Sequence, residues 1–284
     1  MSGVLGPEAA AVALGLASAL TWGAADFGGG LASRRAALFG VVFLTFAVGA
    51  ALALPIALIR AEPLPSPSDV GWAIAAGLAG GIGISALYGG LAAGRMGVVA
   101  PVTGVIAALI PVLVGAATEG LPPPLVAVGI GCALVAVVLV GRTHDPEDGP
   151  SGLPYGLLAG AAIGGFNVCV AQFGEGRVFG PFTIVRLAEI VFIGGLILLA
   201  RRPWRLDRPL LGPVALVGVL DMAGNAFFIA ATQVGRLDVA AVLSSLYPVT
   251  TVVLAVVLLR ERVTPSHALG IGLAAVAVGL IAGG

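Results

Sequence analysis

Four ionisable residues lie inside long apolar stretches of this sequence: Asp26, Arg186, Glu189 and Asp221. A charged side chain at the centre of a bilayer costs about 2.5–3.5 kcal/mol on insertion scales, so it usually faces protein or water and serves a function. Arg186 and Glu189 are three positions apart, a spacing that brings their side chains together on one face of a helix. The pair can neutralise itself so that the helix inserts, or it can face a charged solute that replaces one partner, and the spacing fits both roles.

Asp26 follows Trp22 by four residues, so a helix places the carboxylate and the indole ring on the same side. The alternative is that Asp26 ends its helix near the membrane surface and is solvated. The apolar stretch continues to Arg34, which favours a functional role. Asp221 precedes Asn225 by four residues and shares a helix face with it. Removal from water favours the neutral form of a carboxyl group, which makes Asp26 and Asp221 candidates for carrying a proton.

Two tyrosines and three prolines indicate where rings and helix interruptions occur. Tyr88 and Tyr247 are amphipathic and fit either the wall of a cavity or the membrane interface. Pro248 lacks an N–H and frees a carbonyl one turn earlier, which protein or cavity water must satisfy inside a membrane. We expect Pro101 and Pro111 to break an earlier helix in a comparable way. Interrupted helices at corresponding places in two halves are typical of a transporter's binding site.

The composition of the 284 residues excludes several classes of protein. Hydrophobic residues make up 59% and charged residues 10%, whereas a soluble domain is nearer half apolar and a quarter charged. The 14 basic and 14 acidic residues balance, so no basic excess favours nucleic acid. All the basic residues are arginine, which excludes a P-loop or Schiff-base lysine. The two histidines and two cysteines have no metal-binding spacing, so we expect no metal and no cofactor.

Ten apolar stretches are each long enough to cross a bilayer, which takes roughly 20 helical residues. Short polar connectors separate them, and no connector is long enough for a soluble domain. The stretches are 9–32, 36–59, 70–92, 98–117, 124–141, 153–173, 182–200, 210–231, 239–259 and 266–283. The sequence therefore predicts an all-α integral membrane protein with ten transmembrane helices.

The two halves of the chain repeat each other. When the sequence is aligned with itself without gaps so that Gly15 falls on Gly156, further glycines, prolines and an arginine of the two halves coincide. Such a repeat predicts two five-helix units, residues 1–143 and 144–284. Because five is an odd number, the second unit must cross the membrane in the opposite orientation to the first, which makes the repeats inverted.

The same register relates polar positions of the two units. The corresponding pairs are Asp26 with Asn167, Thr45 with Arg186, and Gly80 with Asp221. We expect Asp26 and Asn167 to offer polar groups at matching depth. The charge of Asp221 is an addition to the second unit only.

Arginine placement tests the inversion independently, because arginines concentrate in cytoplasmic loops. Their bias between odd and even loops reverses from the first unit to the second, as inverted repeats require. Of the thirteen loop arginines, ten lie on one side and three, Arg60, Arg177 and Arg236, lie on the other. Taken literally, the majority side is cytoplasmic, and both termini, including Gly284, face outward.

Both units contain a proline, a helix-ending glutamate and a later glycine. The second unit adds two small residues and a threonine, and the first adds a Trp-Gly pair near its start. In the second unit the positions are Ala240, Ala241, Pro248, Glu261, Thr264 and Gly270, and in the first they are Trp22, Gly23, Pro111, Glu119 and Gly129. Pro181 precedes Arg186 near the start of the second predicted helix of the second unit. On these residues the chain resembles the EamA-type members of the drug/metabolite transporter superfamily over essentially its whole length. The resemblance implies metabolite or drug transport, often export of amino acids, and such proteins are commonly drawn with both termini inside.

We therefore expect a secondary transporter that moves small amphipathic organic solutes by alternating access, with amino acids or related metabolites first and export as the direction. A multidrug or cationic-compound exporter and a passive facilitator remain alternatives. An intramembrane enzyme is disfavoured, because the membrane carboxylates lack a histidine partner or paired motif. The expected substrate-binding residues are Trp22, Asp26, Tyr88, Asn167, Arg186, Glu189, Asp221, Asn225 and Tyr247.

The carboxylates of this set would meet an ammonium group, Arg186 a carboxylate, and the aromatic rings an apolar body. The expected partners are the small-molecule substrate, the lipid bilayer and, as a coupling ion, protons, with no nucleic acid. We expect the chain to act as a monomer in a bacterial-type inner (plasma) membrane, without catalytic residues.

Overall fold

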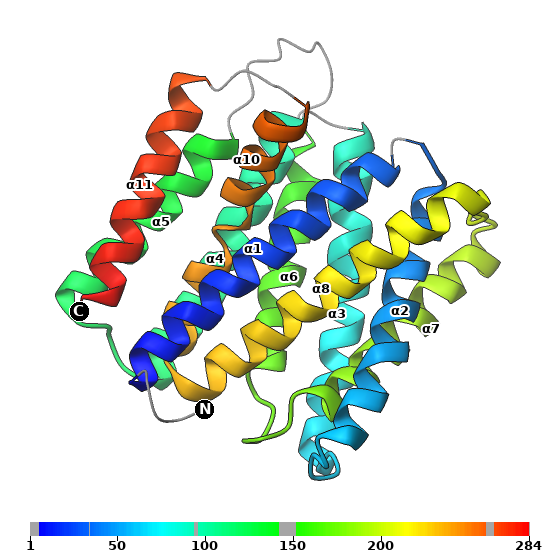
Figure 1. The fold of residues 1–284 in the computed structure, drawn as a ribbon, viewed down its shortest axis with the longest axis horizontal. Coiled ribbons are helices and arrows are strands. Elements are labelled where there is room, and N and C mark those ends of the chain that lie inside the picture. Colours follow the sequence, from blue (N-terminus) through cyan, green and yellow to red (C-terminus); the bar gives the residue numbers. More distant parts are fainter. Residues whose placement is uncertain (1–5, 34, 94–95, 142–151, 260–263, 284) are drawn as a thin grey trace.

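The computed structural model describes residues 6–33, 35–93, 96–141, 152–259 and 264–283, and every regular element in these ranges is an α-helix (Figure 1). The first half contains α1 (Pro7–Ser33), α2 (Leu38–Ile59), α3 (Pro67–Ala93), α4 (Met96–Thr118) and α5 (Pro124–Gly141). The second half contains α6 (Leu153–Val170), α7 (Phe179–Leu199), α8 (Arg208–Val234), α9 (Leu237–Ser244), α10 (Tyr247–Leu259) and α11 (Pro265–Ala282). The predicted all-helical fold class is confirmed.

Each predicted apolar stretch begins and ends within three residues of the helices found in the structure. The ninth stretch forms two helices, because α9 ends at Ser244 and α10 begins at Tyr247. This break lies next to Pro248, where the sequence predicts an interruption.

The comparable break predicted in α4 is wrong. This helix runs without interruption from Met96 to Thr118, through Pro101 and Pro111. A proline removes one backbone hydrogen bond, and in a membrane helix neighbouring helices, side chains and small backbone adjustments can compensate for that loss. The number of prolines in a helix therefore does not by itself predict a break.

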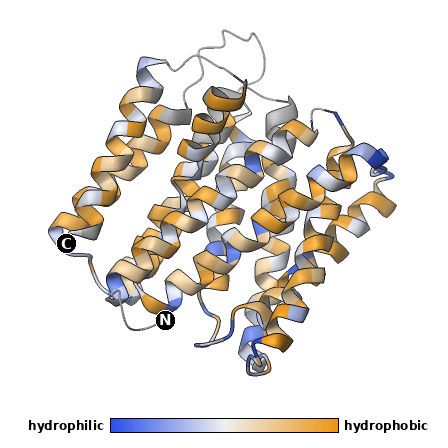
Figure 2. Cartoon of the chain, in the orientation of Figure 1, coloured by the Kyte–Doolittle hydropathy of each residue, from blue (hydrophilic) through white to orange (hydrophobic). Residues whose placement is uncertain are grey.

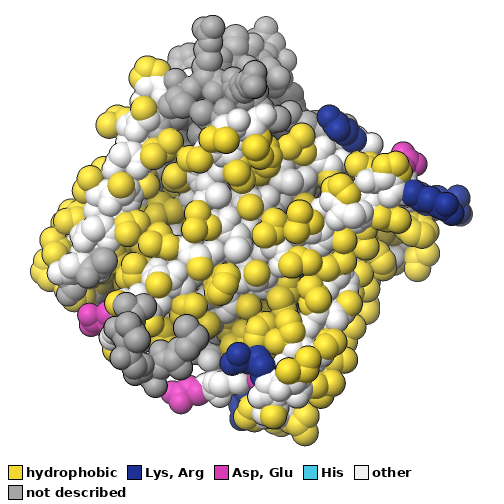
Figure 3. Space-filling view, in the orientation of Figure 1, with side chains coloured by type: hydrophobic (Ala, Val, Ile, Leu, Met, Phe, Trp, Pro, Cys, Tyr) yellow, Lys and Arg dark blue, Asp and Glu magenta, His cyan; other side chains and the backbone are white. Residues whose placement is uncertain are grey.

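The helices carry an apolar surface suited to a bilayer. Six of them, α1, α2, α3, α6, α7 and α8, are long and apolar enough to span a membrane by length and composition. Shorter apolar helices cover residues 102–118, 124–139 and 268–281. Hydrophobic residues run along the helices in Figure 2, and charged side chains in Figure 3 lie at the two ends of the helices, with a hydrophobic belt between them.

Figure 1 shows that the two halves run in opposite directions: α1 starts at the end of the bundle where α11 finishes, whereas α6 starts at the other end. The packing follows the same symmetry, because α1 packs on α8 as α6 packs on α3, and α2 meets its counterpart α7 as α5 meets α11. The chain therefore consists of two inverted five-helix repeats. The predicted boundary between residues 143 and 144 lies outside the described residues and stays a prediction.

Close glycine contacts recur in the register that relates the two halves. A Cβ on Gly15 would lie 2.9 Å from Leu243 Cβ, and a Cβ on Gly156 would lie 3.2 Å from Val102 Cβ. In this register Gly156 is the counterpart of Gly15, and Leu243 is the counterpart of Val102. The same close helix contact thus occurs once in each half. Glycine allows it, because helices in lipid associate by close packing of small residues.

Candidate functional site

A cavity of about 110 Å3 lies between the two repeats and brings together eight of the nine predicted site residues. These are Trp22, Asp26, Asn167, Arg186, Glu189, Asp221, Asn225 and Tyr247. The ninth, Tyr88, has a side chain outside the described part of the structure. A single buried water needs roughly 10–15 Å3, so this cavity has room for a small solute.

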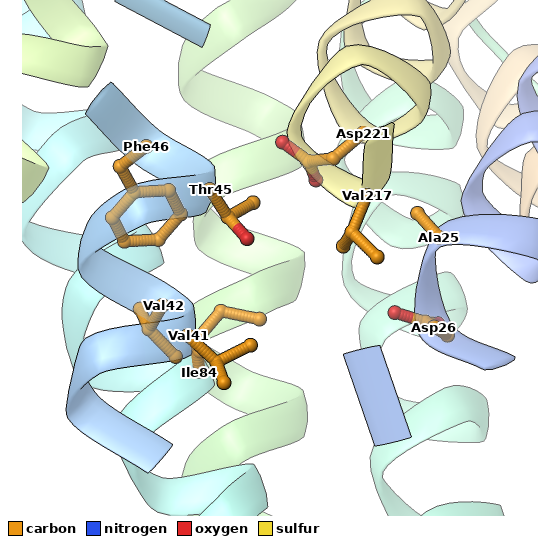
Figure 4. A pocket seen from close by; sticks show the side chains of 9 residues that line it. All are labelled: Ala25, Asp26, Val41, Val42, Thr45, Phe46, Ile84, Val217 and Asp221. Atoms are coloured by element: carbon orange, nitrogen blue, oxygen red, sulfur yellow. The ribbon is translucent and has the colours of Figure 1, made fainter. Parts of the chain in front are cut away.

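A second part of the cavity continues towards the α1–α2 connection and shares Asp26, Phe46, Ile84 and Asp221 with the first part. In Figure 4, Asp221 and Thr45 point into the gap between α8 and α2, and Asp26 points into it from α1. Carboxylates from both repeats therefore face the same space.

Arg186 is the centre of a buried charge cluster. Its Nη1 donates to Glu189 Oε2 at 2.6 Å, and its Nη2 donates to Asp221 Oδ2. Arg186 and Glu189 are only 1% and 2% exposed. The predicted pairing of Arg186 with Glu189 is present in the structure, and Asp221 is a second partner, which the sequence does not reveal because it lies on another helix.

Two aromatic rings lie against the Arg186 guanidinium. Its Cζ lies 4.9 Å from the ring centroid of Phe46 and 4.5 Å from that of Phe182, within the range of a cation–π contact. The backbone of α2 approaches from the edge, because a Cβ on Gly49 would lie 2.9 Å from Arg186 Nε. Phe182 is four residues before Arg186 on α7, so helical spacing could have identified it, whereas Phe46 comes from α2 and carries no such signal.

Gly80 on α3 makes room for the cluster. A Cβ at this position would lie 2.5 Å from Glu189 Oε1 and 3.1 Å from the ring of Phe166. Gly80 is the counterpart of Asp221, so the position that carries a carboxylate in one repeat has no side chain in the other. This difference is what lets α3 approach Glu189.

Asp221 and Asn225 lie on one face of α8, as their spacing predicts. The Asn225 side-chain amide donates to the backbone carbonyl of Asp221 at 2.8 Å and approaches Asp221 Oδ1 at 3.4 Å. The Asp221 side chain is 24% exposed, in contrast to Arg186 at 2%. Asp221 therefore both holds Arg186 and faces the cavity.

Asn167 offers an acceptor without a partner. It is 7% exposed, and its Oδ1 has no hydrogen-bond partner among the described residues. Asn167 and Asp26 both occupy the second half of their helices, and α6 and α1 run in opposite directions (Figure 1). The two residues therefore reach the same cavity from helices that run in opposite directions, and the expected matching depth stays a prediction.

Asp26 is not covered by neighbouring helices and lines both parts of the cavity. The helix α1 continues for seven more residues to Ser33, so Asp26 does not end it. Trp22, one turn earlier, packs on Phe228 with a distance of 5.6 Å between ring centroids. Gly224 on α8 leaves room for the indole ring, because a Cβ there would overlap it.

Tyr247 is the first residue of α10 and lines the cavity beside the break between α9 and α10. Ser245, which lies in that break, also lines the cavity, and its hydroxyl donates to the Val242 carbonyl at 2.7 Å. The sequence identifies the break but does not single out Ser245 as a lining residue.

Loops of the two repeats are joined by polar contacts at the end of the bundle where α1 starts. Glu62, in the α2–α3 loop, accepts hydrogen bonds from the backbone N–H groups of Val178, Phe179 and Gly180 at 3.2, 2.9 and 3.0 Å. These groups form the N-terminus of α7, where unsatisfied N–H donors and the helix dipole favour a carboxylate. Glu62 therefore caps a helix of the other repeat.

Two further carboxylates make similar connections at this end. Asp69 accepts hydrogen bonds from the Gly174 N–H and from Arg177 Nη1, both at 2.9 Å. Glu119 accepts from the Leu237 N–H at 3.1 Å and lies 4.0 Å from Arg236. The side-chain hydrogen bonds of Asp69 and Glu119 thus tie loops of the first repeat to loops of the second.

Arg236 also donates to Asp238 Oδ2 at 2.8 Å, and this hydrogen bond raises the pKa of the Arg236 guanidinium. Arg60 and Arg177 pair with Glu62 and Asp69. All three arginines at the end of the bundle that has the fewer arginines are therefore matched by carboxylates. No group of three or more potential metal ligands occurs among the described residues.

Comparison with known proteins gives two findings. The family model described as the EamA-like transporter family matches the chain twice, over residues 9–142 and 150–283. A solved structure titled "Crystal structure of protein" superposes with a TM-score of 0.77, is 18% identical, and is covered to 95%, as is this chain. At that identity the superposition shows the fold alone. A search of curated proteins found no match.

Proposed function

The chain belongs to the EamA-like transporter family, and from this premise we propose that it is a secondary transporter that moves small amphipathic organic solutes by alternating access. The observation that supports the proposal most is the cavity between the inverted repeats, lined by polar and aromatic residues from both. In transporters built from inverted repeats the ligand lies near the midplane where the repeats meet, and rocking of one repeat against the other exposes it to either side.

The lining of the cavity favours solutes that carry an amine and an apolar body. Asp26 and Asp221 provide carboxylates, and Trp22, Phe166 and Tyr247 provide rings. Amino acids and cationic organic compounds both have an ammonium group, and we propose these two classes, with export as the direction.

We propose protons as the coupling ion, with Asp26 or Asp221 as the carrier. An inward-directed proton gradient imposed on proteoliposomes is expected to change the rate of solute movement. Equal rates with and without the gradient would remove proton coupling and leave facilitated transport.

Counterflow in proteoliposomes tests the proposed function. Unlabelled solute inside the vesicles should drive transient accumulation of labelled solute from outside, which a carrier produces and a passive channel does not. A panel of amino acids, amines and nucleosides covers the solute classes. No accumulation of any member would contradict a carrier that uses this cavity.

Two variants on α3 test whether counterflow depends on the cavity. Ile84 lines both parts of the cavity, whereas Ile82, two positions earlier, is 38% exposed. Ile84→Trp should reduce counterflow strongly because it fills the cavity, and Ile82→Trp should leave it near the wild-type rate. Equal effects would place the solute pathway elsewhere.

We also propose that the chain acts as a monomer in a bacterial-type inner membrane, with both termini on the non-cytoplasmic side. The orientation rests on the ten-to-three split of the loop arginines between the two ends of the bundle. A reporter protein that becomes fluorescent only in the cytoplasm can be fused to the C-terminus. Fluorescence from this fusion would contradict the proposed orientation.

A further inference from the structure

The charged groups that line the cavity do not balance. Asp26, Glu189 and Asp221 contribute three carboxylates, and Arg186 contributes the one guanidinium among the described lining residues. Glu189 and Asp221 both bond to that guanidinium. With all groups ionised, the cavity therefore carries an excess of two negative charges, and such a site favours a cation.

Arg186 is not free to receive the carboxylate of a solute. Its Nη1 and Nη2 already bond to Glu189 and Asp221, and the rings of Phe46 and Phe182 lie within cation–π distance of it. The side chain is 2% exposed. A solute carboxylate would have to displace Glu189, which would then be buried without a partner, or Asp221, which faces the cavity and would repel it.

The carboxylates and the unpartnered buried atom that remain available to a solute in the cavity are acceptors. Asp26 forms no salt bridge with a described cationic residue and lines both parts of the cavity. Asp221 is partly exposed beside it. Asn167, more than nine-tenths buried, lines the cavity with an Oδ1 that has no described partner. A buried acceptor without a partner is costly, so a ligand that donates a hydrogen bond there is favoured.

Apart from Asn225 and Ser245, the rest of the lining is apolar or aromatic, and it includes the rings of Trp22, Phe166 and Tyr247. Rings of this kind bind an organic ammonium through its apolar body and through cation–π attraction. They offer little to a hydrated inorganic cation, which needs several oxygen ligands. An organic cation therefore fits the lining better than a metal ion does.

We propose that the preferred solutes are amphipathic organic amines that lack a carboxylate. Their ammonium group binds between Asp26 and Asp221, and a hydrogen-bond donor at the far end of the molecule meets Asn167. Arg186 acts as a fixed internal counter-charge and not as a receptor for substrate carboxylate. This inference rests on the proposed transport function and narrows its substrate class.

Matched pairs of solutes that differ only in the carboxylate test the inference on the unaltered protein. Suitable pairs are phenethylamine with phenylalanine, tyramine with tyrosine, and cadaverine with lysine, measured by counterflow and by ligand-induced thermal stabilisation. We expect each amine to bind at least about tenfold more tightly than its amino acid, since the carboxylate finds no free cation. Amino acids that bind as tightly as the amines, or more tightly, would overturn the inference and leave the transport function standing.

Failure of the whole panel has a different meaning. If no solute of any class shows counterflow, the proposed function itself fails, and the amine preference fails with it. Counterflow of neutral or anionic solutes without that of amines would overturn only the amine preference.

Two variants on α1 separate the cavity carboxylate from general effects of charge. Asp26→Asn should weaken amine binding by about tenfold or more and have little effect on a neutral solute. Glu8→Gln removes the same charge at an exposed position of the same helix, outside the cavity, and should leave amine binding unchanged. Amine binding that is equal in the wild type and in Asp26→Asn would exclude Asp26 as the ammonium site.

Discussion

The two repeats share one helix arrangement, apart from the break between α9 and α10, and differ in their chemistry at the cavity. Positions that set the helix packing are glycine in both repeats, as with Gly15 and its counterpart Gly156. Positions that face the cavity differ: the pairs are Asp26 with Asn167, Thr45 with Arg186, and Gly80 with Asp221. Duplication thus supplied the scaffold, whereas single-repeat substitutions supplied the charge.

The difference is coordinated between positions. Arg186 and its partner Asp221 both belong to the second repeat, and the first repeat contributes the space they require, through Gly49 beside Arg186 and Gly80 beside Glu189. An arginine buried at this depth needs both a counter-charge and a neighbour without a side chain. Both conditions are met around Arg186 and not around its counterpart Thr45, because the counterpart of Asp221 is a glycine and the counterpart of Gly49 is Ile190.

Removing the charge from the second repeat should have the largest effect. Arg186→Met leaves the buried Glu189 and the partly exposed Asp221 without their partner, and we expect a loss of about 3–5 kcal/mol in the free energy of unfolding. Thermal unfolding of the purified protein in detergent measures it. The matched change in the first repeat, Thr45→Val, removes no charge and should cost about 1 kcal/mol or less.

The double variant Arg186→Met with Glu189→Gln should recover part of the stability lost in Arg186→Met, because one of the two unpaired carboxylates is also removed. A loss of stability in the double variant equal to the sum of the losses in Arg186→Met and Glu189→Gln would show that the two residues act separately.

Filling the space left by the first repeat should have the next largest effect. Gly80→Ala places a Cβ 2.5 Å from Glu189 Oε1, so we expect a loss of about 1–3 kcal/mol in unfolding free energy. Gly71→Ala on the same helix meets nothing within 4 Å and should be neutral or stabilising by up to about 1 kcal/mol. Equal stability of the two variants would mean that α3 can shift away from Glu189 at little cost.

Asp221→Asn makes the repeats more alike in charge and keeps a side chain that can accept a hydrogen bond from Arg186. We expect folded protein with about tenfold slower counterflow, equivalent to about 1.4 kcal/mol. Asp207→Asn changes an exposed carboxylate at the start of the same helix and serves as the control. Counterflow at the wild-type rate in Asp221→Asn would show that this charge does not contribute to transport.

Glu62→Gln should have the smallest effect, because it weakens one connection between the repeats without removing the side chain. The loss of a charged cap at the N-terminus of α7 is expected to cost about 1 kcal/mol. Glu175→Gln, exposed in the α6–α7 loop, is the control for loss of charge at this end. The same melting temperature in both variants would contradict a stabilising cap.

The helices could be predicted closely, since bilayer thickness fixes how many apolar residues a crossing takes and charges mark its ends. The internal repeat could also be read directly, because the glycines that make close helix contacts recur in one register. The continuity of α4 through Pro101 and Pro111 could not be predicted, since it depends on how neighbouring helices satisfy the backbone hydrogen-bonding groups that the prolines free.

Eight candidate site residues could be found because polar groups are rare in apolar stretches and therefore stand out. Their partners could not be found. The bond from Arg186 to Asp221 and the ring of Phe46 depend on how α7 packs against α8 and α2, and no local spacing encodes that packing. From the sequence alone, Arg186 is interpreted as a binding group for the carboxylate of a solute. In the structure its two terminal nitrogens are already bonded to Glu189 and Asp221.

The cap that Glu62 makes on α7 has a consequence for biosynthesis. Val178 follows Glu62 by 116 residues, so at roughly 5–20 residues per second the ribosome needs about 6–23 s to supply the helix that this carboxylate caps. During that interval α2 and α3 are in the membrane while their connecting loop lacks its partner. A nascent chain stalled before α7 should therefore be open to proteolysis at this loop, and the arrival of α7 should protect it.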